Sequence, residues 1–174
     1  SSSFQNVSTE NKSIILMLLR ILSNIFCNTD EGMMKYCPPV LELLLNSISE
    51  IKNEDIIDPI LMVISNLLNY SQYFDTENAL KIANFFIELL DPKIQEPHLR
   101  IPFILHQIID ISIEVVPIVV NPTTIPILIE LTSSSFQNVR ISTILIFISF
   151  LRKSEVEYKE IIYDALSWSW FGSV

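Results

Sequence analysis

The side chains most able to do chemistry are too scattered in this sequence to predict a catalytic or metal site. His98 and His106 are eight residues apart, which exceeds the spacing that brings two imidazoles to one metal ion, and no HExxH or paired CxxC pattern accompanies them. Glycine occurs only at Gly32 and Gly172, so the sequence has no glycine-rich phosphate loop and no GxSxG turn. We therefore predict no catalytic residue, no metal ligand and no cofactor, and we interpret the chain as a non-enzyme.

Two other groups of reactive side chains have simple interpretations. Cys27 and Cys37 lie in apolar or helix-flanking segments without a second pair of ligands, which predicts free thiols in a reducing compartment. Glu42, Glu88 and Glu130 recur at equivalent places in a repeated pattern. We expect them on a solvated helix face, not as a paired acid and base.

A row of side-chain amides is the pattern of greatest chemical interest. Asn24, Asn66 and Gln107 follow one another at intervals of about 42 residues, a period typical of helical arrays. Met62 and Phe103 each stand four residues before an amide, and this spacing places two side chains on one face of a helix. Amides can satisfy the backbone groups of an extended peptide whatever its sequence. Asp58 stands one helical turn before Met62 and adds a carboxylate to the same face. The candidate peptide-binding residues are therefore Asn24, Asp58, Met62, Asn66, Phe103 and Gln107.

The amides also have a purely structural interpretation. Asn66 could satisfy a carbonyl group at a helix end or bind a neighbouring repeat, as polar residues near helix ends often do. Replacing Asn24 and Asn66 together by Ala separates the two hypotheses, because loss of binding with an unchanged melting temperature favours the groove and collapse of the fold favours structure.

Whole segments recur with the same period. Residues 40–44 return as 86–90 and again as 128–131, and residues 1–7 return unchanged as 133–139. This period predicts a solenoid, in which a unit of two or three helices buries its apolar face by stacking on its neighbours. We expect a single solenoid over residues 1–174, with repeats at about 1–27 (partial), 28–70, 71–111, 112–153 and 154–174 (partial).

The composition favours an all-α fold. The chain has 49% hydrophobic residues, nine prolines and only two glycines, and it lacks the sustained period-two alternation of strands. A short helix is expected to end near Tyr36, followed by a corner at Pro38 and Pro39. The other expected helices cover residues 13–27, 40–49, 59–69, 77–83, 84–90, 97–110, 113–120, 125–131, 139–153 and 158–171.

Charge and hydropathy exclude two classes of partner. A net charge of −9 argues against nucleic acid, which requires clustered Lys and Arg, and it favours a basic partner. Residues 115–129 are uncharged, but Pro117, Pro122 and Pro126 interrupt them and they are shorter than the roughly 20 residues of a membrane span. We expect two buried helices that meet at a corner there. The chain opens without a signal peptide or initiator Met, and we expect it to begin inside a longer protein.

Two segments resemble armadillo repeats of the importin-alpha type. The first is residues 38–44 (PPVLELL), followed by a polar linker and a helix that ends with residues 64–68 (ISNLL); the second is 124–131 (TIPILIEL), followed by 139–141 (VRI). The resemblance spans most of the chain. It implies an armadillo/HEAT-type right-handed helical-repeat solenoid of about three to four repeats.

In the importin-alpha family, a Trp and an Asn one turn later recur along the groove of third helices and hold a basic peptide. The Asn position is matched by Asn24 and Asn66, becomes Gln107 and is occupied by Phe150 in the last repeat. The Trp position is occupied by Arg20, Met62, Phe103 and Ile146. The resemblance implies a nuclear transport receptor found in the cytoplasm, the nucleus or both.

Three functions remain from the sequence. The first is a protein-binding adaptor, with an importin-like transport role as its most specific form. The second is a structural scaffold subunit of a larger assembly with no peptide groove. The third is an enzyme whose active site would need residues from outside this sequence. Apolar helices at residues 13–27 and 158–171 would also leave the ends of the solenoid uncapped, which predicts self-association.

Overall fold

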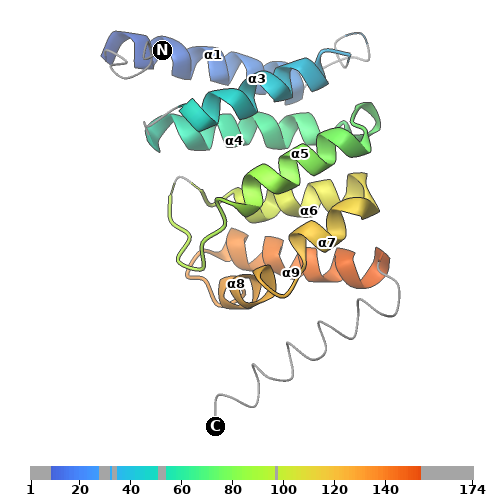
Figure 1. Cartoon of the computed structure of the whole chain (residues 1–174). Coiled ribbons are helices and arrows are strands. Elements are labelled where there is room, and N and C mark those ends of the chain that lie inside the picture. The colour runs from blue at the N-terminus through green and yellow to red at the C-terminus, as the bar shows by residue number, and fades with distance from the viewer. Residues whose placement is uncertain (1–8, 28–31, 33–34, 51–53, 97, 154–174) are drawn as a thin grey trace.

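The computed structural model describes residues 9–27, 32, 35–50, 54–96 and 98–153, and in this part of the chain every regular element is a helix (Figure 1). The all-α prediction is confirmed there. The elements are α1 (Thr9–Cys27), α3 (Cys37–Glu50), α4 (Glu54–Leu68), α5 (Thr76–Ile87), α6 (Ile101–Ile111), α7 (Val116–Val119), α8 (Thr124–Leu131) and α9 (Gln137–Lys153), with 3-10 turns η1 (Ser71–Tyr73) and η2 (Ile113–Val115).

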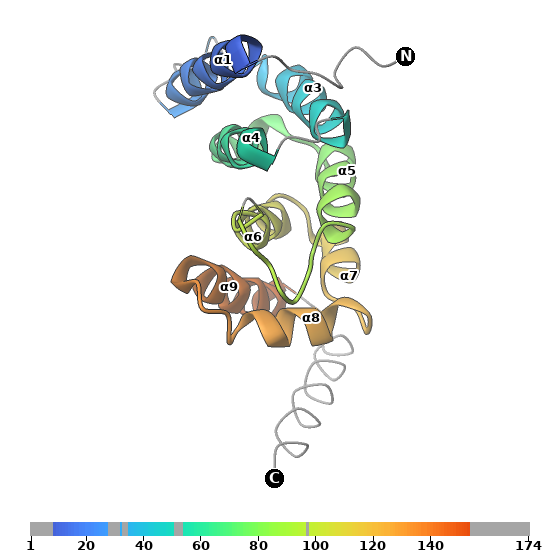
Figure 2. The same ribbon diagram turned by 90° about the vertical axis from the view of Figure 1, so that its left-hand side faces the viewer.

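The helices form two layers. Helices α1, α4, α6 and α9 stack side by side in one layer, and α3, α5 and α7 form the other, with α8 beside α9 at the end of the stack (Figure 2). The stack is curved, and the layer of α1, α4, α6 and α9 lies on the inner side of the curve. We call it the inner layer and the other the outer layer. Each inner helix packs against the next one, α1 on α4, α4 on α6 and α6 on α9.

The core lies between the layers and is centred on two inner helices that are apolar on most sides. The fully buried side chains of α4 and α6 include Ile56, Leu61, Val63, Ile64, Leu67, Ile101, Ile104, Leu105, Ile108 and Ile109. Removing each such side chain from water contributes about 1.5–3 kcal/mol. This burial holds the inner helices at fixed places.

The predicted positions of two proline features are wrong. Pro38 and Pro39 do not form a corner before a helix, because α3 already begins at Cys37. A proline is tolerated in the first turn, where its missing N–H would have had no partner. Pro59 lies inside α4, since this helix begins at Glu54, five residues before it.

The helix boundaries after Tyr73 also differ from those predicted. The two helices expected at residues 77–83 and 84–90 are one helix, α5, because no Gly or Pro interrupts it. Asp75 starts this helix with a reciprocal cap, in which its carboxylate accepts a hydrogen bond from the Asn78 backbone N–H at 2.9 Å. Helix α6 begins at Ile101, four residues later than predicted, with Pro102 in its first turn.

The predicted corner between two apolar helices is confirmed. The segment Ile113–Val119 meets Thr124–Leu131 at 86°. Asn121 fixes the corner by accepting hydrogen bonds from the backbone N–H groups of Thr123 and Thr124 at 2.9 and 3.1 Å. Among the described residues, no single helix is long and apolar enough to cross a membrane. The two helices of this bent pair reach that length and apolar character only when they are counted together.

Residues 28–31 and 33–34 of the short helix expected before Tyr36, and the whole helix expected at residues 158–171, lie outside the described residues.

Candidate functional site

All six candidate peptide-binding residues lie on the inner layer. Asn24 belongs to α1, three others to α4, and Phe103 and Gln107 to α6. None of the six is fully buried: Asn24 and Phe103 are exposed, and Asp58, Met62, Asn66 and Gln107 are half-buried. The structure therefore places the predicted residues on one layer, although it brings several of them into contact with the neighbouring helix.

Asn66 binds the preceding inner helix. Its Nδ2 donates hydrogen bonds to Ser23 Oγ at 2.9 Å and to the Ser23 carbonyl oxygen at 3.4 Å. Ser23 is 5% exposed. The amide of Asn66 thus satisfies polar atoms that the packing of α1 on α4 has removed from water.

Gln107 makes the same kind of contact one helix further on. Its Nε2 donates to the Ser65 carbonyl oxygen and to Asn69 Oδ1, and its Oε1 accepts from Ser65 Oγ, each at 3.0 Å. Both N–H groups of this amide and its oxygen are therefore hydrogen-bonded within the protein. We call the Ser23–Asn66 and Ser65–Gln107 contacts the amide rungs.

Charged side chains join the same helices at the same separation. Arg100 Nε donates to Asp58 Oδ1 at 2.7 Å, across 42 residues. Lys12 pairs with Asp55 between α1 and α4, 43 residues apart. The last junction is closed by Lys153, whose Nζ donates to the Ile109 carbonyl oxygen at 2.8 Å, across 44 residues. Polar contacts at 42 to 44 residues therefore link every pair of neighbouring inner helices.

The last helix of the row has a different register from the one expected. The repeat within the sequence assigns Ile146 and Phe150 to the positions of Phe103 and Gln107. These two side chains are 0% and 1% exposed. Ile144 and Ile148 are 47% and 36% exposed, and they stand 41 residues after Phe103 and Gln107. A shift of two residues turns a helix by about 200°. The exposed row on α9 is therefore Ile144 and Ile148.

His106 lies where a further rung would begin. No third rung forms there, because among the described residues His106 Nδ1 is buried without a hydrogen-bond partner. Burial lowers the pKa of His106 below its ordinary value of 6.5; the charge of Asp110 opposes this effect and that of Lys153 adds to it. The imidazole also stacks on Phe103, with ring centroids 6.3 Å apart.

A cleft opens where α4, α6 and α9 begin. Its volume is about 730 Å³, and its lining residues are Asp55, Asp58, Pro59, Glu96, Leu99, Arg100 and Asn138. Lys12 also reaches Asp55. Three carboxylates therefore outnumber two cations, and we call this feature the acidic cleft.

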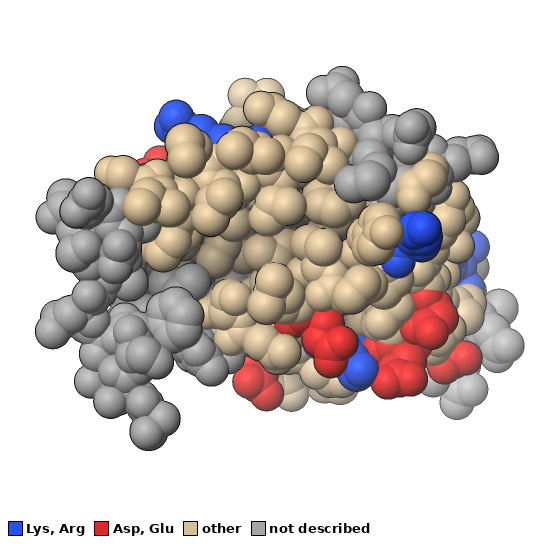
Figure 3. Space-filling model, turned by 90° about the horizontal axis from the view of Figure 1, so that it is seen from above, with Lys and Arg blue, Asp and Glu red and all other residues tan. Residues whose placement is uncertain are grey.

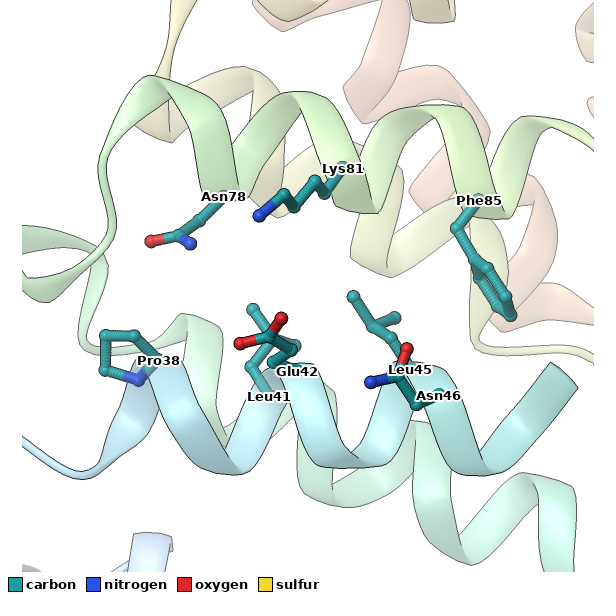
Figure 4. A pocket seen from close by; sticks show the side chains of 8 residues that line it. All are labelled: Pro38, Leu41, Glu42, Leu45, Asn46, Asn78, Lys81 and Phe85. Atoms are coloured by element: carbon teal, nitrogen blue, oxygen red, sulfur yellow. The ribbon is translucent and has the colours of Figure 1, made fainter. Parts of the chain in front are cut away.

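A second cavity, of about 320 Å³, lies in the outer layer between α3 and α5 (Figure 4). Leu41, Leu45 and Phe85 supply apolar wall, while Glu42 and Lys81 face each other across it. The hydrogen bond that Lys81 donates to the Glu77 carboxylate, together with the charge of that carboxylate, raises the pKa of Lys81. None of the six predicted residues lines this cavity.

The sequence carries a signal for the amide rungs. Ser23 and Ser65 each directly precede an amide of the row, and these hydroxyls are the partners of the next amide along the chain. In the described part of the chain, no three His, Cys, Asp or Glu side chains are grouped closely enough to hold a metal ion. Comparison of the chain with known protein families, with curated proteins and with solved structures gives no match.

Proposed function

We propose that the chain is a protein-binding adaptor, built as a right-handed armadillo/HEAT-type solenoid of about three to four repeats, whose inner layer holds an extended segment of a partner protein. The observation that carries this proposal is the separation of 42 to 44 residues that recurs among the polar contacts at each inner junction. A constant separation is what a repeat of one structural unit produces. Repeated units offer a partner the same kind of contact at each step.

The contacts offered to the partner are mainly apolar. Met62, Phe103 and Ile144 follow one another at intervals of 41 residues, and each is half-buried or exposed. Neighbouring packed helices lie about 8–10 Å apart, and an extended chain advances about 3.3 Å per residue. One side chain in about every three residues of the partner would therefore meet this row. The hydrogen bonds of the amide rungs are made within the protein, between neighbouring inner helices. They therefore keep this row of apolar side chains at its spacing.

The acidic cleft and the net charge of −9 favour a partner segment with basic residues. Asp55, Asp58 and Glu96 lie at the edge of the inner layer, where a lysine next to the apolar anchors of the segment could reach them. The specific form of the proposal is an importin-alpha-like role, in which the partner is a nuclear import signal and the protein acts in the cytoplasm and the nucleus.

Peptide binding tests the proposal directly. We expect a fluorescein-labelled ten-residue peptide of Lys, Leu and Pro to bind saturably in a fluorescence-anisotropy titration, and the same peptide with Glu in place of Lys to bind more weakly. Phe103→Ala should weaken binding about tenfold, which corresponds to about 1.4 kcal/mol.

The matched control is Ile113→Ala, because Ile113 is 53% exposed but lies on η2, outside the inner layer. Equal losses in the two variants, or equal affinity for the basic and acidic peptides, would contradict the proposed groove. A second candidate function is that of a scaffold subunit in a larger assembly, and it is favoured by the apolar side chains that α1 leaves uncovered.

A further inference from the structure

The cavity between α3 and α5 lies in the outer layer, apart from the groove proposed on the inner layer (Figure 4). We call it the outer cavity. Its volume of about 320 Å³ is at the lower end of the range of small-molecule sites. Its lining residues recur on each helix at spacings of three or four positions, so the cavity follows both helices for about two turns, or about 10 Å. Among them are Glu42, Leu45 and Asn46 on α3 and Asn78, Lys81 and Phe85 on α5.

The outer cavity has a polar end and an apolar end. Glu42 and Lys81 face each other at the polar end. About one turn further along each helix, Leu45 and Phe85 form the apolar end. The Phe85 ring points toward α3 and makes a T-shaped contact with the Phe86 ring, with centroids 5.2 Å apart. Leu45 and Phe85 are half-buried, so part of their apolar surface is still open to a ligand.

Negative charge exceeds positive charge at the polar end. Lys81 Nζ binds the Glu77 carboxylate at 2.9 Å, and the charges of Glu77, Glu42 and Asp75 all act on this one ammonium group. Figure 3 looks along the stack and shows acidic side chains gathered along the edge of the outer layer, with few basic side chains among them. A cation is therefore the ligand charge that complements this end of the cavity.

We propose that the outer cavity binds a small arylalkyl amine, with its ammonium group at Glu42 and its ring between Leu45 and Phe85. The rise along α3 from Glu42 to Leu45 is about 4.5 Å, which two methylene groups between the nitrogen and the ring can bridge. The ring would pair with Phe85, and aromatic pairs attract each other beyond the area that they remove from water. Glu42 makes no hydrogen bond or ion pair within the described part of the chain, so it gives up no such partner when the ammonium group arrives.

An NMR titration of the 15N-labelled full chain with 2-phenylethylamine at low ionic strength tests the proposal. We expect saturable shifts of the backbone N–H groups in residues 40–46 and 78–85, with a Kd of about 1 mM because the probe has only about nine non-hydrogen atoms. 2-Phenylethanol keeps the ring and lacks the charge, and it should bind about fivefold more weakly. n-Butylamine has the stem of a lysine side chain without a ring, and it should also bind about fivefold more weakly.

Two substitutions should change the affinity for the amine in opposite directions. Glu42→Gln keeps the shape of the side chain and should weaken binding of the amine about fivefold, with no change for 2-phenylethanol. Lys81→Gln removes the cation that competes with the ligand and should strengthen binding of the amine about twofold. Both side chains are exposed, so neither change should alter the fold. Glu130→Gln is the matched control and should bind like the wild type, because Glu130 is an exposed glutamate of α8 that does not line the cavity.

An anionic ligand would give the reverse pattern. 3-Phenylpropanoate should bind more weakly than 2-phenylethanol; tighter binding than the amine, lost in Lys81→Gln, would make the cavity an anion site and overturn the proposal. The absence of saturable shifts up to about 20 mM amine, or shifts confined to other segments, would also overturn it. So would equal affinity for the amine and either neutral or ringless probe, or equal losses in Glu42→Gln and Glu130→Gln.

Discussion

At the scale of single residues, the amides of the inner layer are engaged by the neighbouring helix. Asn66 and Gln107 lie on the inner layer as predicted, and their side chains are hydrogen-bonded to Ser23 and Ser65 of the preceding helix. Spacing along a chain predicts which residues share a face. It does not predict whether a flexible amide turns outward to a partner or sideways to its neighbour.

The rungs make a testable contribution to stability. Gln107→Ala removes three hydrogen bonds and leaves the Ser65 carbonyl and hydroxyl without this partner, so we expect a loss of about 1–3 kcal/mol in the free energy of unfolding. Urea denaturation measures it. Gln72→Ala, at an exposed glutamine of η1, is the control and should change stability by less than about 0.5 kcal/mol. Similar losses in the two variants would show that the rung does not stabilise the fold.

His106 predicts a dependence of stability on pH. Its pKa is lowered in the folded protein, so below about pH 6.5 the unfolded chain binds more protons than the folded chain at this residue. Stability from this group is therefore present above pH 6.5 and is lost as the pH falls toward the folded-state pKa. We expect the fall in melting temperature between pH 7.5 and 5.5 to be smaller in His106→Leu than in the wild type, and an equal fall in the two proteins would contradict this role of His106.

At the scale of helices, the existence of the elements was predictable and their limits were not. Runs of Ile and Leu bounded by proline predict helices throughout, but proline is a poor marker of a helix limit here, because Pro38, Pro39 and Pro59 lie inside helices. The register of α9 was missed because its sequence is apolar on several sides. Only burial in the folded chain distinguishes Ile148 from Phe150.

The cap of α5 is a test at this scale. Asp75 accepts the Asn78 N–H at 2.9 Å, and Asn78 Oδ1 accepts the Asp75 N–H at 3.4 Å. We expect Asp75→Ala to lower the free energy of unfolding by about 0.5–2 kcal/mol, and Asp75→Asn to have a much smaller effect because asparagine caps helices equally well. Chemical denaturation at pH 7 distinguishes them. Equal destabilisation would assign the effect to the charge and not to the cap.

At the scale of the whole molecule, stability should be graded along the stack. Helix α6 packs between α4 and α9, whereas α1 packs on an inner helix from one side only among the described residues. Hydrogen exchange followed by mass spectrometry should show faster exchange in α1 than in α6. Uniform protection of the two helices would mean that the chain opens only as a single unit.

The shared direction of the inner helices gives this surface a polarity. Figure 1 shows α1, α4, α6 and α9 running the same way, so their amino-terminal ends lie along one edge and their carboxyl-terminal ends along the other. Asp55 and Asp58 lie near the first edge, and Lys153 binds the carbonyl of Ile109 at the second, as the helix dipole favours. A polypeptide laid across the layer meets this same asymmetry at each step. For the partner segment proposed above, the two possible directions are therefore energetically different, and the proposed groove would distinguish a sequence from its reverse.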